Sequence, residues 1–162
     1  MEELTTELIL ASLGGMMTSG RQIGSVLALN EQSAKYDLTL TEAQAKELLE
    51  TRSMMLKETE MIEFGGGTVE NIIKAFCDSP YLDRRNYETS LHTLIELYYT
   101  IKDETGGIMN DADTVDFLKT CFNGVCGGSL EALEGDCVPK LLRHINNGGK
   151  YNSFRIGNYI YE

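Results

Sequence analysis

The chain has 162 residues, enough for one domain with a sizeable core, and its 25 acidic and 14 basic side chains give a formal charge of −11. A field of that sign repels nucleic acid and anionic membranes, so we expect neither as a partner. Only 2 prolines occur and helix-forming residues dominate, which favours helices over a loop-rich fold. Because the acidic excess is spread along the chain, a solvated acidic surface accounts for it.

The N-terminal residues argue for a cytoplasmic protein. Met1-Glu2-Glu3-Leu4 carries acidic side chains where a secretory signal needs basic ones. The longest nearly apolar run, residues 8–17, is too short to span a bilayer. We therefore expect a soluble, cytoplasmic protein whose 4 cysteines are reduced thiols and not a disulfide framework.

Apolar residues recur at helical spacing along most of the chain. The predicted helices are residues 4–13, 19–36, 41–58, 68–77, 86–105, 110–123 and 136–146, with a short helical turn over residues 129–133. No internal repeat and no linker divides them. The sequence therefore predicts an all-α fold, a single compact domain of about six to seven helices over residues 1–149.

Two of these helices carry strong signals. Thr41 and Gln44 match a capping box, in which a hydroxyl and an amide satisfy each other's backbone donors at a helix start. The helix over residues 86–105 has the longest regular pattern, with apolar residues alternately four and three positions apart. This seam, which predicts a helix packed along another, consists of Tyr87, Leu91, Leu94, Tyr98 and Ile101.

The start of the last predicted helix is assigned from two residues. Asp136 is a good N-cap, and Pro139 then lies in the first turn, where proline is tolerated. Asn147 and the glycines after it end the helix. We therefore expect a separate helix that begins at Asp136.

The last residues follow a different pattern. From Tyr151 to Tyr161 the side chains alternate with a period of two, which is typical of a strand. A lone strand has no sheet to join. The short C-terminal tail, residues 150–162, therefore docks as an extended segment, pairs with its copy in a homodimer, or is disordered.

Residues 63–82 combine several features of a binding site. Gly65, Gly66 and Gly67 end one helical pattern and Thr68 opens the next, so their amides could hold an anion at a helix N-terminus. A phosphate loop needs a lysine after the glycines, and none follows here. A tight connection between two helices, with glycines in left-handed conformations, accounts for the segment better.

Three cysteines and a histidine near the C-terminus are weak metal-ligand candidates. Cys121, Cys126, Cys137 and His144 could in principle supply a zinc site. They lack the paired short knuckles that make zinc assignments strong, and Cys121 lies on the apolar face of its own helix. We expect buried cysteines and no metal.

His92 has acidic neighbours on its own helix. Glu88 and Glu96 lie four residues before and after it, and a carboxylate-bound histidine can be a base or a metal ligand. A di-iron bundle needs the spacing Glu-x-x-His on two helices, which neither histidine has. The pattern favours a solvated histidine among surface acids.

No arrangement for nucleophilic catalysis is recognisable. Residues 127–131, Gly-Gly-Ser-Leu-Glu, lack the second glycine of a nucleophile elbow, and no strand precedes them. We assign no catalytic residue and no cofactor, and the sequence leans toward a protein that is not an enzyme.

Several strings of the chain resemble a family of small bacterial proteins that is catalogued as a domain of unknown function. The strings are residues 28–31 (ALNE), 38–41 (LTLT), 63–67 (EFGGG), 75–82 (AFCDSPYL) and 124–131 (GVCGGSLE). The resemblance covers about residues 27–145 and leaves out the tail after Gly149. It implies a bacterial origin and a single domain, and it brings no activity, cofactor or catalytic residue.

The leading hypothesis is a non-catalytic soluble helical protein that acts through protein–protein contacts, with a tail that could add a strand to a partner or form a homodimer. The alternative is a small-molecule-binding protein or enzyme with a pocket around residues 63–82. That pocket would be lined by Phe64, Phe76 and Tyr81 and would open toward the Thr68 amide. A third hypothesis is an acidic regulator that occupies a basic protein surface.

Overall fold

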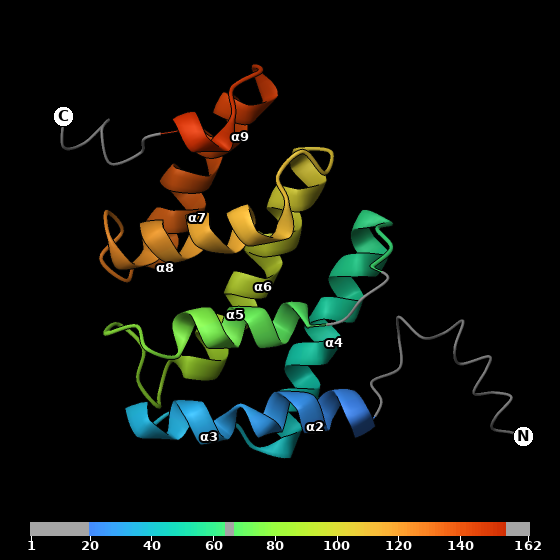
Figure 1. The fold of residues 1–162 in the computed structure, drawn as a ribbon, viewed down its shortest axis with the longest axis vertical. Helices are drawn as coiled ribbons and strands as arrows, with labels where there is room; N and C mark the ends of the chain where they lie inside the picture. The colour runs from blue at the N-terminus through green and yellow to red at the C-terminus, as the bar shows by residue number, and fades with distance from the viewer. Residues whose placement is uncertain (1–19, 64–66, 155–162) are drawn as a thin grey trace, which may run out of the picture.

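The structure is a computed structural model that describes residues 20–63 and 67–154 (Figure 1). Its longer helices, each of nine or more residues, are α2 (Gly20–Ala28), α4 (Glu42–Thr59), α5 (Thr68–Phe76), α6 (Tyr87–Glu104), α7 (Asp111–Asn123) and α9 (Val138–Asn146). Shorter helical turns are α3 (Asn30–Ser33), η2 (Ala34–Tyr36), α8 (Leu130–Ala132), η3 (Leu133–Cys137) and η4 (Tyr151–Ser153). The described residues contain no strand, so the predicted all-α fold is confirmed. None of the helices they form is long and apolar enough to cross a membrane.

Helices α4 and α7 begin where the sequence predicts, and at both points a side chain satisfies free backbone donors. At the start of α4, Thr41 Oγ1 accepts from the Gln44 N–H at 3.1 Å, and Gln44 Oε1 accepts from the Thr41 N–H at 2.9 Å. The predicted capping box is therefore present. At the start of α7, Asn110 Oδ1 accepts from the Asp113 N–H at 2.7 Å.

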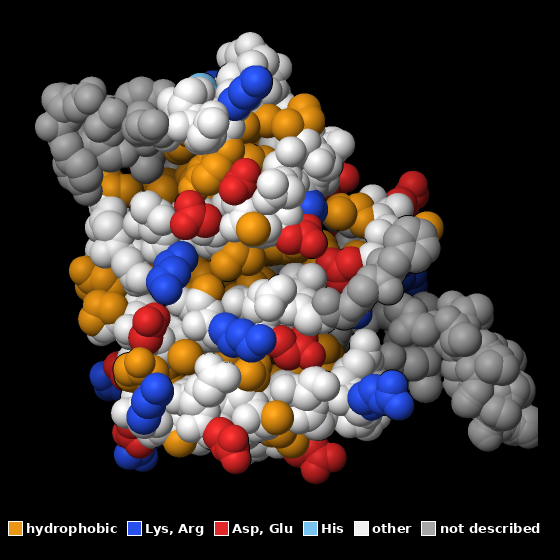
Figure 2. Space-filling model, in the orientation of Figure 1, with side chains coloured by type: hydrophobic (Ala, Val, Ile, Leu, Met, Phe, Trp, Pro, Cys, Tyr) orange, Lys and Arg blue, Asp and Glu red, His pale blue; other side chains and the backbone are white. Residues whose placement is uncertain are grey.

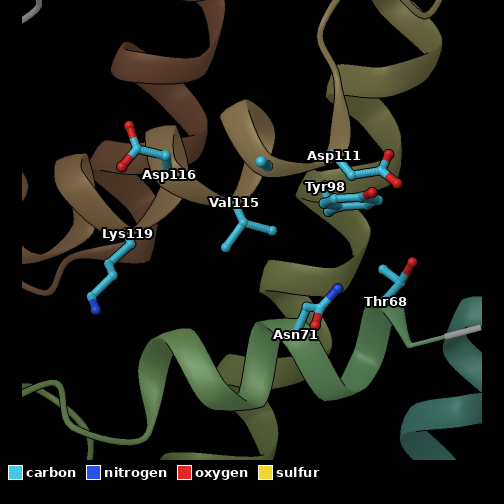
Figure 3. Close-up of a pocket in the computed structure, with 8 residues that line it drawn as sticks. Thr68, Asn71, Tyr98, Asp111, Val115, Asp116 and Lys119 are labelled. Atoms are coloured by element: carbon cyan, nitrogen blue, oxygen red, sulfur yellow. The ribbon is translucent and has the colours of Figure 1, made fainter.

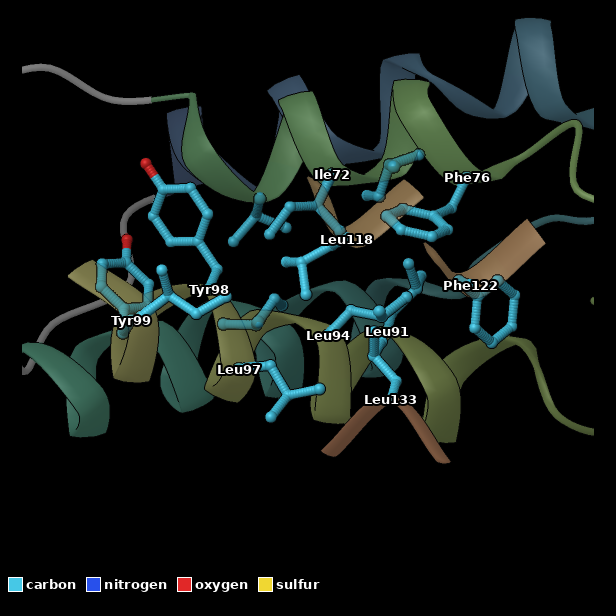
Figure 4. Close-up of a cluster of buried hydrophobic side chains, with 14 of the residues drawn as sticks. Ile72, Phe76, Leu91, Leu94, Leu97, Tyr98, Tyr99, Leu118, Phe122 and Leu133 are labelled. Carbon is cyan, nitrogen blue, oxygen red and sulfur yellow. The ribbon is translucent and has the colours of Figure 1, made fainter. Parts of the chain in front are cut away.

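Helix α6 lies at the centre of the hydrophobic core. Its predicted seam, from Tyr87 to Ile101, is buried, with each of the five side chains at most 2% exposed. Helices α4, α5, α7 and α9 all pack on α6. Figure 1 shows α2, α5 and α7 one above the other, crossing the directions of α4 and α6. The side chains that fill the core around α6 include Ile72, Phe76, Leu91, Leu94, Leu118 and Phe122 (Figure 4).

The predicted separate helix that begins at Asp136 is wrong. The chain runs from α8 through the π-helical turn η3 into α9 without a break. In this turn the Val138 N–H donates to the Leu133 carbonyl, five residues back, and both Leu133 and Cys137 are buried. The wide turn ends at Cys137, two residues before Pro139, which has no N–H to donate. The helix continues into α9 without an N-cap.

The described part of the tail is not a strand, which corrects the period-two prediction for these residues. Tyr151 starts the turn η4, and its ring packs edge-on against Phe117 with the centroids 6.5 Å apart. Phe154 is buried against the same Phe117 ring at 5.9 Å and against His144 at 5.3 Å. Residues 151–154 therefore dock on α7 and α9. Residues 155–162 and the predicted helix over residues 4–13 lie outside the described residues.

Candidate functional site

The glycine segment is anchored by a partly buried carboxylate on its N-terminal side. Glu63 accepts hydrogen bonds from Arg52 Nε at 2.9 Å, from the Tyr99 hydroxyl at 2.8 Å and from the Thr68 hydroxyl at 2.9 Å. Arg52 Nη2 adds a contact of 2.8 Å to the same carboxylate. Glu63 thus ties α4, α6 and the start of α5 together, which supports the interpretation of this segment as a connection between helices.

Glu63 also lies close to the start of α5, where the sequence analysis considered an anion site. Thr68 is the first residue of this helix, and Gly67 precedes it in a left-handed conformation with φ of 94°. The carboxylate of Glu63 lies beside this helix N-terminus, where negative charge is favourable. The carboxylate of Glu63 therefore lies at the start of α5, next to the amides that the sequence suggested as an anion site. Gly65 and Gly66 lie outside the described residues.

A groove of about 450 Å³ lies between α5 and α7. In Figure 3, Thr68 and Asn71 point from α5 toward α7, and Val115 points from α7 toward α5. Hydrophobic side chains are exposed in the hollow between the two helices (Figure 2). The lining residues are Thr68, Asn71, Tyr98, Asp111, Ala112, Val115, Asp116 and Lys119.

Most polar groups that line this groove are bound to other residues of the chain. Lys102 Nζ lies 2.6 Å from Asp111 Oδ1, and this contact lowers the pKa of Asp111. Asp116 accepts a hydrogen bond of 2.6 Å from the Tyr151 hydroxyl. The side-chain amide of Asn71 has no hydrogen-bond partner among the residues that the structure describes. The groove therefore presents mainly apolar surface, with one amide available to a guest.

The two described aromatic residues that were predicted to line a pocket, Phe76 and Tyr81, do not line this groove. Phe76 is fully buried and packs edge-on against Phe122, with ring centroids 5.6 Å apart. Tyr81 packs on the other side of Phe122 at 6.1 Å. Phe64 lies outside the described residues. Helical spacing places Phe76 on the same face as Ile72, and this face forms the core. Of the described residues that were predicted to form the pocket, Thr68 lines the groove, whereas Phe76 and Tyr81 do not.

The structure brings three of the four candidate zinc ligands close together and separates the fourth. Cys121, Cys126 and Cys137 are all buried free thiols, and Sγ of Cys126 lies 3.3 Å from Sγ of Cys137. His144 Nε2 instead lies 2.8 Å from the Lys150 carbonyl oxygen. Burial, together with the contact to Cys137, raises the pKa of Cys126 to about 12. Cys126 therefore stays a protonated thiol, and all three cysteines fill the core.

His92 is half-buried between α4 and α6, where the sequence predicted a solvated residue. Its ring contacts Thr51 of α4 and Glu88 of its own helix. Glu47 of α4 completes this group, whereas Glu96, the other predicted neighbour, is exposed and is not part of it. No local spacing links Glu47 to His92, so sequence reasoning missed it.

Comparison with known proteins supports the resemblance found in the sequence. The model of a family of unknown function, DUF6323, matches residues 25–151, which is most of the chain. No curated protein matches the chain, and no solved structure does.

Proposed function

We propose that this chain, which belongs to the DUF6323 family of unknown function, is a non-catalytic binding protein that receives an apolar side chain of a protein partner in the groove between α5 and α7. The observation that carries the proposal is the apolar surface of this groove, which stays open while the neighbouring acidic groups are bound within the chain. The partner segment pairs its apolar side chain with a lysine or an arginine.

The apolar part of the proposal rests on the residues of α7 that face α5. Val115 is only half-buried and Ala112 is exposed, although both line a concave surface. A side chain of the size of leucine or phenylalanine would remove this surface from water, which is the main favourable contribution at the centre of an interface. The Asn71 amide would hydrogen-bond the backbone of the bound segment.

The basic part of the proposal rests on charge. Asp111 and Asp116 are both exposed beside the groove, and the whole chain carries a charge of −11. A carboxylate that already accepts one hydrogen bond still has lone pairs for a second donor. A cationic partner is attracted at long range and held at the rim, whereas an acidic one is repelled.

Selection from a random peptide library tests the proposal. Peptides that bind the full chain are collected after removal of those that bind Val115→Glu, in which a carboxylate occupies the groove. We expect the retained peptides to combine a large apolar residue with lysine or arginine, and to shift the amide NMR signals of residues lining the groove. Retained peptides of acidic character, or signals that shift elsewhere, would contradict the proposal.

A matched control is available on α4. Met54 is an exposed apolar residue that does not line the groove, so Met54→Glu changes charge and hydrophobicity in the same way as Val115→Glu. We expect Met54→Glu to keep peptide binding within about twofold, while Val115→Glu weakens it at least tenfold, since ~1.4 kcal/mol is lost with the buried apolar contact.

The size of the groove favours a second candidate function, the binding of a small molecule. Its volume of about 450 Å³ falls within the range of pockets that hold small ligands. The same variants separate the two functions. This alternative would be favoured if the library selection retained no peptide and a small apolar compound shifted the amide NMR signals of the groove residues.

We further propose that the protein works in the bacterial cytoplasm. The four cysteines are free thiols, and the Cys126–Cys137 sulfur distance of 3.3 Å is too long for a disulfide bond, as suits a reducing compartment. Self-association through residues 150–162 stays a prediction of the sequence. Tyr151 and Phe154, in the described part of this tail, are used for contacts within the chain.

A further inference from the structure

Three potential metal ligands meet on the side of the molecule where α4 packs along α6. Glu88 and His92 are four residues apart on α6 and so share one helix face, and Glu47 reaches them from α4. One ligand atom of each residue lies within 4.8 Å of the other two. His92 Nε2 is 3.1 Å from Glu88 Oε2. Donor atoms on a tetrahedral zinc ion, each about 2.0–2.2 Å from the metal, lie roughly 3.3–3.5 Å apart.

The histidine ring is held in place from behind. Its Nδ1 lies 2.6 Å from Oγ1 of Thr51, a buried residue of α4. A hydroxyl can donate or accept, so Oγ1 of Thr51 can accept a hydrogen bond from a protonated Nδ1. In that tautomer Nε2 directs its lone pair toward the two carboxylates. Histidine ligands of metals are commonly oriented in this way through their other ring nitrogen.

Glu88 is oriented by a separate contact. Its Oε1 accepts a hydrogen bond of 3.3 Å from Gln44 Nε2, and Gln44 is itself fixed by its capping-box bond with Thr41. This leaves Oε2 of Glu88, the atom nearest to His92, facing Glu47 and the imidazole. Both His92 and Glu88 therefore have one atom bound to the protein and one directed into the group.

The two carboxylates of the group are close enough to repel each other unless a positive charge lies between them. A metal cation bound between the carboxylates would remove this repulsion.

We propose that Glu47, Glu88 and His92 form a binding site for a divalent transition-metal ion, with zinc as the best fit and water in the open position. An imidazole with two carboxylates suits zinc better than magnesium or calcium, which prefer oxygen ligands alone. Such an ion would link α4 to α6, and none of its three ligands lines the groove between α5 and α7.

The test uses the full chain, stripped with a chelator and titrated with zinc chloride by calorimetry, with the bound metal counted by elemental analysis. We expect one zinc ion per chain with micromolar or tighter affinity. His92→Gln and Glu47→Gln should each weaken binding at least tenfold. Glu96→Gln removes the same charge from an exposed position one turn beyond His92 and should bind zinc like the parent chain.

Cobalt distinguishes this site from the thiols near Cys126. Cobalt bound to nitrogen and oxygen lacks the sulfur charge-transfer absorption in the near ultraviolet, which a thiolate site would show. We expect no such absorption, and we expect Thr51→Ser to retain binding while Thr51→Val weakens it roughly tenfold. Zinc binding that is absent, that survives both His92→Gln and Glu47→Gln, or that disappears in Cys126→Ala would overturn the proposal. Circular dichroism of each variant shows whether it is folded.

Discussion

At the scale of single residues, the carboxylate of Glu63 connects three helices. Its carboxylate joins Arg52 of α4, Tyr99 of α6 and Thr68 of α5, so three helices depend on one side chain. Burial raises the pKa of Tyr99, with the negative charge of Glu63 adding to the effect, so the tyrosine hydroxyl keeps its proton and donates a hydrogen bond to Glu63. Charge-assisted bonds of this kind are worth more than neutral ones.

Glu63→Gln should therefore destabilise the protein. The substitution keeps the shape of the side chain but leaves the partly buried Arg52 guanidinium without its counter-charge, which costs roughly 2–3 kcal/mol. Urea unfolding followed by circular dichroism measures the loss. Glu58→Gln, an exposed position on α4, serves as the control and should change stability by less than about 0.5 kcal/mol. Equal effects of the two substitutions would show that the Glu63 contacts do not stabilise the fold.

At the scale of elements, Gly128 is one of the glycines that shape the connection between α7 and α8. Gly128 has φ of 84°, and its N–H donates to the Phe122 carbonyl at 2.8 Å. A Cβ atom at this position would lie 2.4 Å from Cγ of Tyr81, far inside van der Waals contact. Gly135, in the turn η3, has open space around its missing Cβ and a backbone conformation that any residue adopts.

These two glycines give opposite predictions. Gly128→Ala should lower the free energy of unfolding by roughly 2–4 kcal/mol, because it combines left-handed strain with a steric clash. Gly135→Ala should raise it by about 0.5–1 kcal/mol, since alanine restricts the unfolded chain and favours a helix. Thermal unfolding of both variants checks the pair. A loss of stability in Gly135→Ala would mean that the π-helical turn does not tolerate a side chain there.

Local sequence patterns predicted some features of these elements and not others. The α6 seam and the Thr41 capping box were predictable because each depends on residues within one or two helical turns. The turn η3 was not, because its wider hydrogen bond has no spacing of its own, and Asp136 before Pro139 imitates an ordinary helix start. The period-two pattern gave a wrong prediction for residues 151–154 for a related reason. Phe154 turns inward because Phe117 and His144 offer it a place in the core.

At the scale of the whole molecule, residues 151–154, just after the predicted boundary at residue 149, pack against the helices. Phe154 is only 7% exposed and Tyr151 hydrogen-bonds to Asp116 of α7, so residues beyond Gly149 contribute to the packing of the domain. The C-terminal contacts hold α7 and α9 together from outside. They also adjoin the groove, because Asp116 lines it.

Phe154→Ala should therefore cost roughly 3 kcal/mol of stability, the usual effect of removing a buried aromatic ring. Tyr36→Ala removes an aromatic ring that is 45% exposed, and it should cost less than about 1 kcal/mol. Chemical unfolding of both variants, measured against the parent chain, makes the comparison. If Phe154→Ala proves as mild as Tyr36→Ala, residues 151–154 are not part of the folded domain.

The sequence by itself determined that this protein is helical, where most of its helices begin and end, and which face of α6 is buried. These properties follow from capping and from apolar spacing, which act over a few residues. Only the tertiary structure decided the groove between α5 and α7, the contacts of Glu63 and the meeting of Glu47 with His92. Each joins side chains from different helices, and the angles at which the helices cross depend on how the whole core packs.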